Sequence, residues 1–338
     1  MMAAISIARP QNRRRSGVAI ALLTGLLVAA SVIHLGLGAR YIAPQTVVQA
    51  LTHYDPHNFD HRIVVTLRLM RLLAALLTGA ALGVAGLLLQ TLIRNPLGEP
   101  HILGLNAGAA LAVVAGSALG LRELAQPWLA IGGAGALFTV VMLLASSGRG
   151  GVTPLKVTLC GVALSAFASS ITAAILILDE QTLLAMRTWL VGDLAGLRWD
   201  MLQTAMIPAG AGALLACAIA PRLNILALGD NIARGLGVNL LGTRVWGLLA
   251  TALLCGAAVS LAGPVGFIGL VVPHLIRRLV TEDLRIAILL AAPTGALLLL
   301  LADIAARTLL APQELSTGVM TALVGAPVFI AIAVRCFK

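Results

Sequence analysis

The chain has 338 residues, of which 59% are hydrophobic and 11% charged, and its formal net charge at pH 7 is +10. An average soluble domain is roughly 25% charged, so this composition argues against a soluble enzyme and predicts a helical membrane protein with many spans. It also argues against a nucleic-acid binder, because the basic residues are not collected on one segment. They stand instead at the ends of apolar runs, as membrane topology requires.

The chain opens with a basic stretch, residues 1–16, which we expect to be a cytoplasmic tail. The apolar run 17–38 follows it. This run is longer than the roughly 7–15 residues of a signal-peptide core, and no clear small-x-small cleavage site follows. We therefore expect an uncleaved first span whose N-terminus lies in the cytoplasm.

Nine further apolar runs are expected to cross the bilayer, whose core requires roughly 20 residues of helix. They cover residues 68–92, 103–121, 128–146, 157–178, 201–220, 245–262, 264–280, 286–307 and 315–334. Ten spans would place both termini in the cytoplasm. Of the 23 Lys and Arg residues we count 15 on the inner side and 8 on the outer side, which agrees with the positive-inside rule.

The polar segment 40–65 is predicted to be an exterior loop. It carries His53, His57 and His61 at four-residue spacing. On a helix these imidazoles would share one face and could bind a metal ion, but Pro56 lies between them and argues against a helix there. We expect an ordinary loop and keep metal handling as the alternative.

Four well-separated cysteines lie in or beside apolar runs, and no CxxC spacing occurs, so we expect packing residues rather than a disulfide or metal framework. They are Cys160, Cys217, Cys255 and Cys336. The sequence offers no P-loop, HExxH or GxSxG motif and no paired carboxylates on one span. We therefore predict neither a catalytic set nor a metal site, and His34, His101 and His274 are expected to be isolated boundary histidines.

An internal repeat is visible: residues 76–86 and 253–263 are identical at seven of eleven positions. They lie in the second and seventh predicted spans, which run in opposite directions, so the two halves would be inverted repeats. Chance similarity among small apolar residues is the alternative. Gly79 and Gly83 in the first copy form a GxxxG pattern, which predicts close helix packing.

Asp303 is the main ionisable residue inside a predicted span, and Arg307 follows it at i+4. A charge in a span indicates a function by default, although here the two side chains could simply neutralise each other. The shortage of buried acids argues against an ion-driven pump. If the chain moves a solute, the energy is expected to come from another subunit.

Two surfaces are candidates for partner contacts. On the inner side, residues 226–236 of the segment 221–243 are expected to form a short helix, ended by glycines, that either docks an energy-supplying subunit or merely connects two spans. On the outer side, Arg68, Arg71 and Arg307 either receive carboxylates of a soluble partner or contact lipid headgroups.

Six ordered stretches resemble the permease subunits of type II ABC importers, the FecCD-type family that carries ferric siderophores, haem and cobalamin. They are residues 67–86, 90–111, 226–238, 263–285, 300–307 and 314–329, including GPVGFIGLVVPHLIRRLVTEDLR at 263–285. Two positions depart from the family's pattern. Its Leu-Pro-Arg is Leu-Met-Arg here, at 69–71, and its Glu-Leu-Pro is Glu-Leu-Ser, at 314–316.

The resemblance implies an all-α polytopic fold of about ten transmembrane helices with an inverted repeat, the type II importer permease fold, over residues 17–338. It implies a bacterial inner-membrane subunit that is not itself an enzyme and binds no cofactor. Its partners would be two cytoplasmic ATPase subunits that use ATP-Mg, a second permease subunit (a copy or a paralogue), a periplasmic or lipid-anchored substrate-binding protein, and membrane lipid, with no nucleic acid.

The resemblance also assigns residues. The ATPase-coupling segment falls on Leu228, Gly229, Asp230, Ala233, Arg234, Gly235, Leu236 and Gly237. Docking of the binding protein falls on Arg68, Arg71 and Arg307. Further family motifs fall on Arg94, Asn95, Pro96, Gly263, Pro264, Pro273, His274 and Asp303. The implied cargo is a ferric siderophore, with haem or cobalamin as alternatives. An ion-coupled secondary transporter is the alternative from another class.

Overall fold

The computed structural model describes residues 13–38, 40–101, 103–121, 125–147, 153–311 and 313–336. Most of the expected N-terminal tail, residues 1–12, lies outside them. The helices that correspond to the ten predicted spans are α1 (Arg13–Gly36), α4 (Leu69–Ile93), α5 (Leu105–Ala118), α6 (Gln126–Ser146), α7 (Pro154–Leu178), α9 (Trp199–Ala227), α11 (Leu240–Ala262), α12 (Ile268–Leu279), α13 (Leu284–Thr308) and α14 (Thr317–Cys336).

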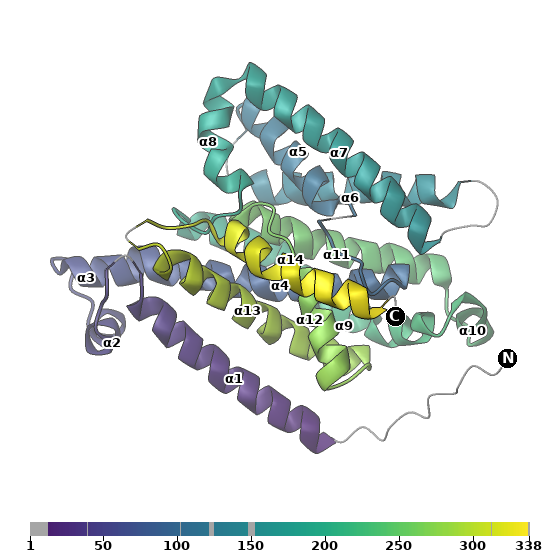
Figure 1. The fold of residues 1–338 in the computed structure, drawn as a ribbon, viewed down its shortest axis with the longest axis horizontal. Helices are drawn as coiled ribbons and strands as arrows, with labels where there is room; N and C mark the ends of the chain where they lie inside the picture. Colours follow the sequence, from purple (N-terminus) through teal and green to yellow (C-terminus); the bar gives the residue numbers. More distant parts are fainter. Residues whose placement is uncertain are drawn as a thin grey trace.

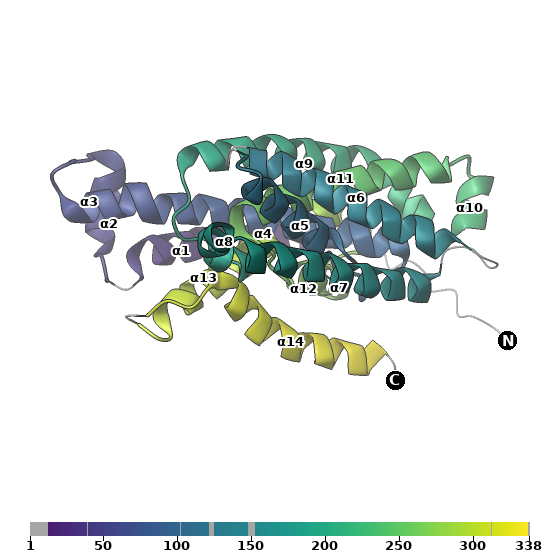
Figure 2. The same cartoon turned by 90° about the horizontal axis from the view of Figure 1, so that it is seen from above.

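Seven helices of the described chain are long and apolar enough to cross a membrane, and the shorter α5, α12 and α14 complete the predicted set. Figures 1 and 2 show an elongated bundle of these helices. The chain is therefore a multi-pass membrane protein. Five smaller helices join the spans: α2 (Pro44–Thr52), α3 (Phe59–Arg62), the π-helical η1 (Ile63–Arg68), α8 (Glu180–Leu190) and α10 (Asp230–Gly235).

The segment 40–65, expected to be an ordinary exterior loop, is more structured than the sequence suggests. Residues 53–58, around Pro56, are not helical, as expected, but most of the segment is helical, and α3, η1 and α4 form one apolar run, Phe59–Ile93, of 35 residues. The Asn58 side chain begins it by accepting hydrogen bonds from the backbone N–H groups of Asp60 and His61. The run continues without a break through Met70, at the start of α4.

The segment 221–243 also differs from the prediction. Its first seven residues continue α9, which contains Pro208 and Pro221 and ends at Ala227. A proline near the end of a long helix removes one backbone hydrogen bond, and the helix continues past it. Between α7 and α9 lies the short helix α8, which begins where the Asp179 side chain accepts hydrogen bonds from the backbone N–H groups of Gln181 and Thr182.

Helix α4 forms the centre of the bundle, and α9, α11, α12 and α13 pack against it. The GxxxG pattern in α4 does pack closely, as predicted. A Cβ at Gly79 would lie 2.8 Å from the Cα of Ala296, and one at Gly83 would lie 3.3 Å from the Cα of Gly295, so the backbones of α4 and α13 are in contact. Such contact requires small residues on both helices.

The two repeat copies run in opposite directions. Helix α4 starts beside α3, at the left of Figure 1, and α11 starts beside α10, at the right. We call these two ends of the bundle the α3 end and the α10 end. The predicted inverted orientation of residues 76–86 and 253–263 is thus confirmed, and α14 ends toward the α10 end.

Helix α14 stands at one side of the bundle (Figure 2) and packs mainly on α13 and α12. Several of its apolar side chains are exposed, among them Leu323, Val324 and Ile330. It is therefore less firmly held by the rest of the chain than the central spans are.

Candidate functional site

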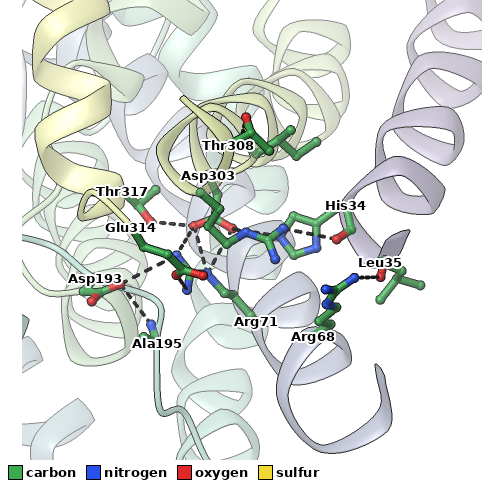
Figure 3. Close-up of polar contacts among 12 residues, drawn as sticks. His34, Leu35, Arg68, Arg71, Asp193, Ala195, Asp303, Thr308, Glu314 and Thr317 are labelled. Atoms are coloured by element: carbon green, nitrogen blue, oxygen red, sulfur yellow. Dashed lines mark hydrogen bonds and ion pairs between the residues drawn. The ribbon is translucent and has the colours of Figure 1, made fainter. Parts of the chain in front are cut away.

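A buried charge cluster lies at the α3 end of the bundle, centred on Asp303 of α13 (Figure 3). Arg71 of α4 donates to Asp303 Oδ1 from Nε at 3.0 Å and from Nη2 at 2.9 Å. Thr317 Oγ1 donates to the same oxygen at 2.6 Å. His34 Nε2 lies 2.8 Å from Oδ2, and Arg307 Nε lies 3.2 Å from it. Four helices therefore meet on one carboxylate.

Other acids balance the remaining positive charge of this cluster. Arg71 Nη1 also donates to Glu314 Oε2 at 2.9 Å, and Arg71 Nη2 lies 3.8 Å from Asp193 Oδ1. Arg68 Nη1 donates to two backbone carbonyls at the end of α1, those of Leu35 at 2.7 Å and Gly36 at 2.8 Å. Charges and carbonyls of this kind are what allow guanidinium groups to remain inside a bundle.

The three arginines expected to contact a soluble partner or lipid headgroups on the outer side are buried in this cluster. Arg68, Arg71 and Arg307 are only 6%, 8% and 3% exposed. They line one wall of a cavity of about 310 Å³ that opens at the α3 end, together with Arg40 and Glu314. The Arg40 side chain is 62% exposed and pairs with Asp60 at 3.2 Å, so it is the most accessible of the four arginines that line the cavity.

The cluster shows how two residues singled out in the sequence, Arg307 and His34, are placed. Arg307 does neutralise Asp303 at i+4, but the closest guanidinium to the carboxylate belongs to Arg71, on another helix. His34 is not an isolated boundary histidine, because its ring is fully buried against Asp303 and its backbone carbonyl accepts a bond from Arg307 Nη2 at 3.1 Å. No pattern in the sequence pointed to this contact between residues 269 positions apart.

The histidines of residues 53–61 do not converge. His61 Nδ1 accepts a hydrogen bond from the backbone N–H of Asp55 at 3.1 Å, and His53 Nδ1 lies 3.0 Å from Thr52 Oγ1. Within the described ranges no three His, Cys, Asp or Glu side chains come together as metal ligands. The cysteines Cys160, Cys217 and Cys255 are free thiols.

At the opposite end, α10 forms a short helix over 230–235, within the predicted range 226–236. It starts after Gly229, whose φ of 114° favours glycine, and the chain leaves it at Gly237. Ala233 is buried against the bundle, whereas Arg234 and Gly235 are exposed. This arrangement holds α10 on the bundle by one face.

Three apolar side chains around α10 are exposed. Ile232 lies in the helix itself, Leu228 lies where α9 ends, and Leu236 directly follows α10. Leu228 and Leu236 were among the residues selected from the sequence, whereas Ile232 was not.

Asp230, the first residue of α10, is held by two arginines. Arg94 Nη2 donates to its Oδ1, and Arg244 Nη2 donates to its Oδ2 at 2.8 Å. Arg94 ends α4 with a φ of 51°, and the Asn95–Pro96 turn follows it. The Asn95 side chain accepts a bond from the backbone N–H of Leu97 at 3.0 Å, which holds the turn.

A second motif, residues 263–267, separates α11 from α12 as the Gly-Pro pair at 263–264 predicts. Gly263 has a φ of 68°, and no Cβ fits there, because the backbone carbonyl of Trp189 lies against it. Pro273 lies inside α12 and is buried, and His274 beside it is partly buried. The break at residues 263–267 therefore places the start of α12 inside the bundle.

The sequence of the chain is also similar to known transport proteins. Residues 26–335 match the model of the FecCD transport family. The chain is 40% identical to the iron(3+)-hydroxamate import system permease protein FhuB of Bacillus subtilis, covering 95% of this chain and 85% of that one. It is 41% identical to the ferric enterobactin transport system permease protein FepD of Escherichia coli, covering 94% and 95%.

Among solved structures, the chain is similar to one from a proposed metal-chelate type ABC transporter in an inward-facing conformation. The TM-score is 0.80 at 28% sequence identity, over 95% of this chain and 99% of the other. Fold, motifs and relatives agree over nearly the whole chain. The protein therefore belongs to the FecCD transport family.

Proposed function

We propose that this chain is the membrane-spanning permease subunit of an ATP-driven importer that carries a ferric siderophore across the bacterial cytoplasmic membrane. The relatives named above are permeases for ferric chelates, which supports the cargo. ATP-Mg would be bound and hydrolysed by two partner subunits. A second permease subunit would complete the translocation path between the two chains.

The observation that carries the proposal is the exposed apolar surface around α10. Leu228, Ile232 and Leu236 are all exposed, and they lie in or next to this short helix at one end of the bundle. An exposed apolar surface around a helix held by paired charges fits a contact with another protein. We assign this end to the cytoplasm and this surface to the ATPase contact.

The opposite end would receive the substrate-binding protein. Its acidic side chains would meet the cavity at the α3 end, where Arg40 is accessible and Arg68, Arg71 and Arg307 form the wall. The buried arginines then act through the shape and positive potential of the cavity. The loaded partner would release its chelate between the two permease chains, and ATP-driven movement at α10 would alternate access.

The test is uptake of labelled ferric siderophores, haem and cobalamin in a strain that lacks only this chain. We expect loss of one ferric chelate, restored by the intact gene. Loss of haem or cobalamin uptake instead would keep the importer and replace the cargo. Uptake that persists without the ATPase and follows an ion gradient would overturn the proposal in favour of a secondary transporter.

A further inference from the structure

The turn that follows α4 is short and stiff. The backbone N–H of Asn95 donates to the carbonyl of Gln90 at 3.1 Å, and that of Gly98 donates to the carbonyl of Asn95 at 3.0 Å. Pro96 and Pro100 fix two further backbone angles. Residues 94–99 therefore move as a unit rather than as a flexible loop.

One end of this turn is tied to α10. Arg94, at the end of α4, pairs with Asp230, the first residue of α10. Both side chains are only partly exposed, 37% for Arg94 and 30% for Asp230. A displacement of α10 would therefore act directly on Arg94, at the start of the turn.

The other end of the turn is tied to the start of α12. The side chain of Glu99, which is 3% exposed, accepts a hydrogen bond from the backbone N–H of Phe267. Asn106 Nδ2 donates to the carbonyl of Val265 at 3.0 Å. A Cβ at Gly269 would lie 3.0 Å from Pro100 Cδ, so the turn also packs on the first turn of α12.

Phe267 extends the contact to α14. Its φ is 69°, a rare conformation for a residue with a side chain, and its backbone N–H donates a hydrogen bond to the Glu99 side chain that holds it there. Its ring packs on the backbone of Gly325 in α14, where a Cβ would lie 2.9 Å from Phe267 Cδ1. Helix α14 is the span with few other contacts to the bundle.

We infer that Glu99 is a positioning residue that joins the 94–99 turn to α12, so that movement of α10 reaches α14 through Arg94, Glu99 and Phe267. The inference rests on the proposed function, since α10 moves only if an ATPase acts on it. Coupling between two separated sites is demonstrated by a change at the far site, so the experiment measures movement of α14.

The test uses the whole complex, with ATPase and binding protein, reconstituted in lipid nanodiscs. The four cysteines are replaced and Val324→Cys is added as a reporter on the exposed face of α14. Two readouts are taken: the rate at which a maleimide labels this thiol with and without ATP, and the number of ATP molecules hydrolysed per ferric chelate transported.

Glu99→Leu removes the hydrogen-bond acceptor, and Glu99→Gln, the matched control, keeps one of similar shape. In Glu99→Leu we expect the ATP-dependent change in labelling to disappear and ATP use per chelate to rise by about five-fold or more, the lower end for coupled sites. Glu99→Gln should keep both. Unchanged labelling and ATP use in Glu99→Leu would overturn the inference.

Arg94→Gln cuts the path at its other end and serves where Glu99→Leu does not fold. If both act on one path, the double variant should be no worse than the more impaired single variant, whereas independent effects would add. Additive losses would overturn the path. Failure of the proposed function looks different: the unmodified complex would then transport no chelate, or its uptake would ignore ATP.

Discussion

The guanidinium of Arg71 in α4 binds the carboxylate of Asp303 in α13. Its Nε and Nη2 atoms both lie within 3.0 Å of Asp303 Oδ1. The two residues are 232 positions apart in the chain. Together with His34, Arg307 and Thr317 they join α1, α4, α13 and α14 at one point. A cluster of this kind stabilises the folded chain only while its charges stay matched.

Asp303→Asn should therefore destabilise the protein strongly. It leaves the guanidiniums of Arg71 and Arg307 buried without their carboxylate, which typically costs about 3–5 kcal/mol. Thermal unfolding of the purified chain in detergent measures the change. Asp200→Asn, at the exposed pair with Arg198, is the control and should cost no more than about 1 kcal/mol. Equal effects of the two substitutions would contradict this account of the cluster.

Gly86→Ala should also destabilise, because its Cβ would collide with the backbone of Gly269 at the start of α12. Neither backbone can move without displacing a helix, and overpacking of this kind costs roughly 1–3 kcal/mol. Gly210→Ala in α9 has open space around its Cβ. It should be neutral or stabilising by up to about 1 kcal/mol. A melting temperature for Gly86→Ala at or above that of Gly210→Ala would argue against the close approach.

Asp230→Arg should separate ATP hydrolysis from transport. It places a third cation beside Arg94 and Arg244, which the present carboxylate holds together. We expect α10 to detach from the bundle and uptake to fall by about ten-fold or more, in the range for coupled sites. The measurement is uptake and ATPase activity in the same membranes. The control is Glu282→Lys, an exposed acid in the turn between α12 and α13, which should retain most uptake.

Glu99 should make the stability of the chain depend on pH. Burial raises the pKa of its carboxyl from an ordinary 4.5 to about 7, so the folded state binds the proton more tightly than the unfolded state does. Its contribution is then most favourable below about pH 4.5 and is lost as the pH rises to about 7. Melting temperatures across this window should fall for the natural protein relative to Glu99→Gln. His101→Asn controls for the other titratable side chain near Gly266, and the slope should persist in it.

Arg40→Glu should weaken docking of the substrate-binding protein, and the loss should shrink at high salt because exposed charges are screened. Arg40 lines the cavity at the α3 end and is accessible there. Reversal of Arg68 or Arg71 is a poor test, because it would disrupt the cluster before it reported on docking. Binding measured at two salt concentrations decides the matter, with Arg187→Glu, an exposed arginine of α8, as control. Undiminished docking in Arg40→Glu would exclude the cavity as the contact.

The ten spans could be predicted from the sequence because each apolar run is a local property of about 20 residues. The start of the second span could not. Arg62 and Arg68 make residues 59–68 resemble the end of a membrane span. Arg68 can lie inside the bundle because its guanidinium donates to the backbone carbonyls at the end of α1. Tertiary contacts of this sort leave no trace in a hydropathy pattern.

The site shows the same division. The short helix with Asp230 and Arg234 was visible from its polar residues and glycines, and so was the boundary between the spans 245–262 and 264–280. The partners of those residues were not, because Arg94 pairs with Asp230 over 136 positions and Glu99 meets Phe267 over 168. Residue types predicted which segments matter, whereas the contacts between them required the fold.

The enclosed position of α4 bears on how the chain is made. Its residues from Gly83 to Ile93 are all buried, and the helices that cover them, α9, α11, α12 and α13, are all synthesised later. During membrane insertion α4 is therefore in the bilayer before these helices exist. Gly79 and Gly83, which contact α13 in the folded chain, stay exposed to lipid until more than half of the chain has been synthesised. A chain that ends before residue 284 lacks α13 and should therefore be degraded faster by quality-control proteases than the full chain. Synthesis of α13 is the step that covers α4 and removes this susceptibility.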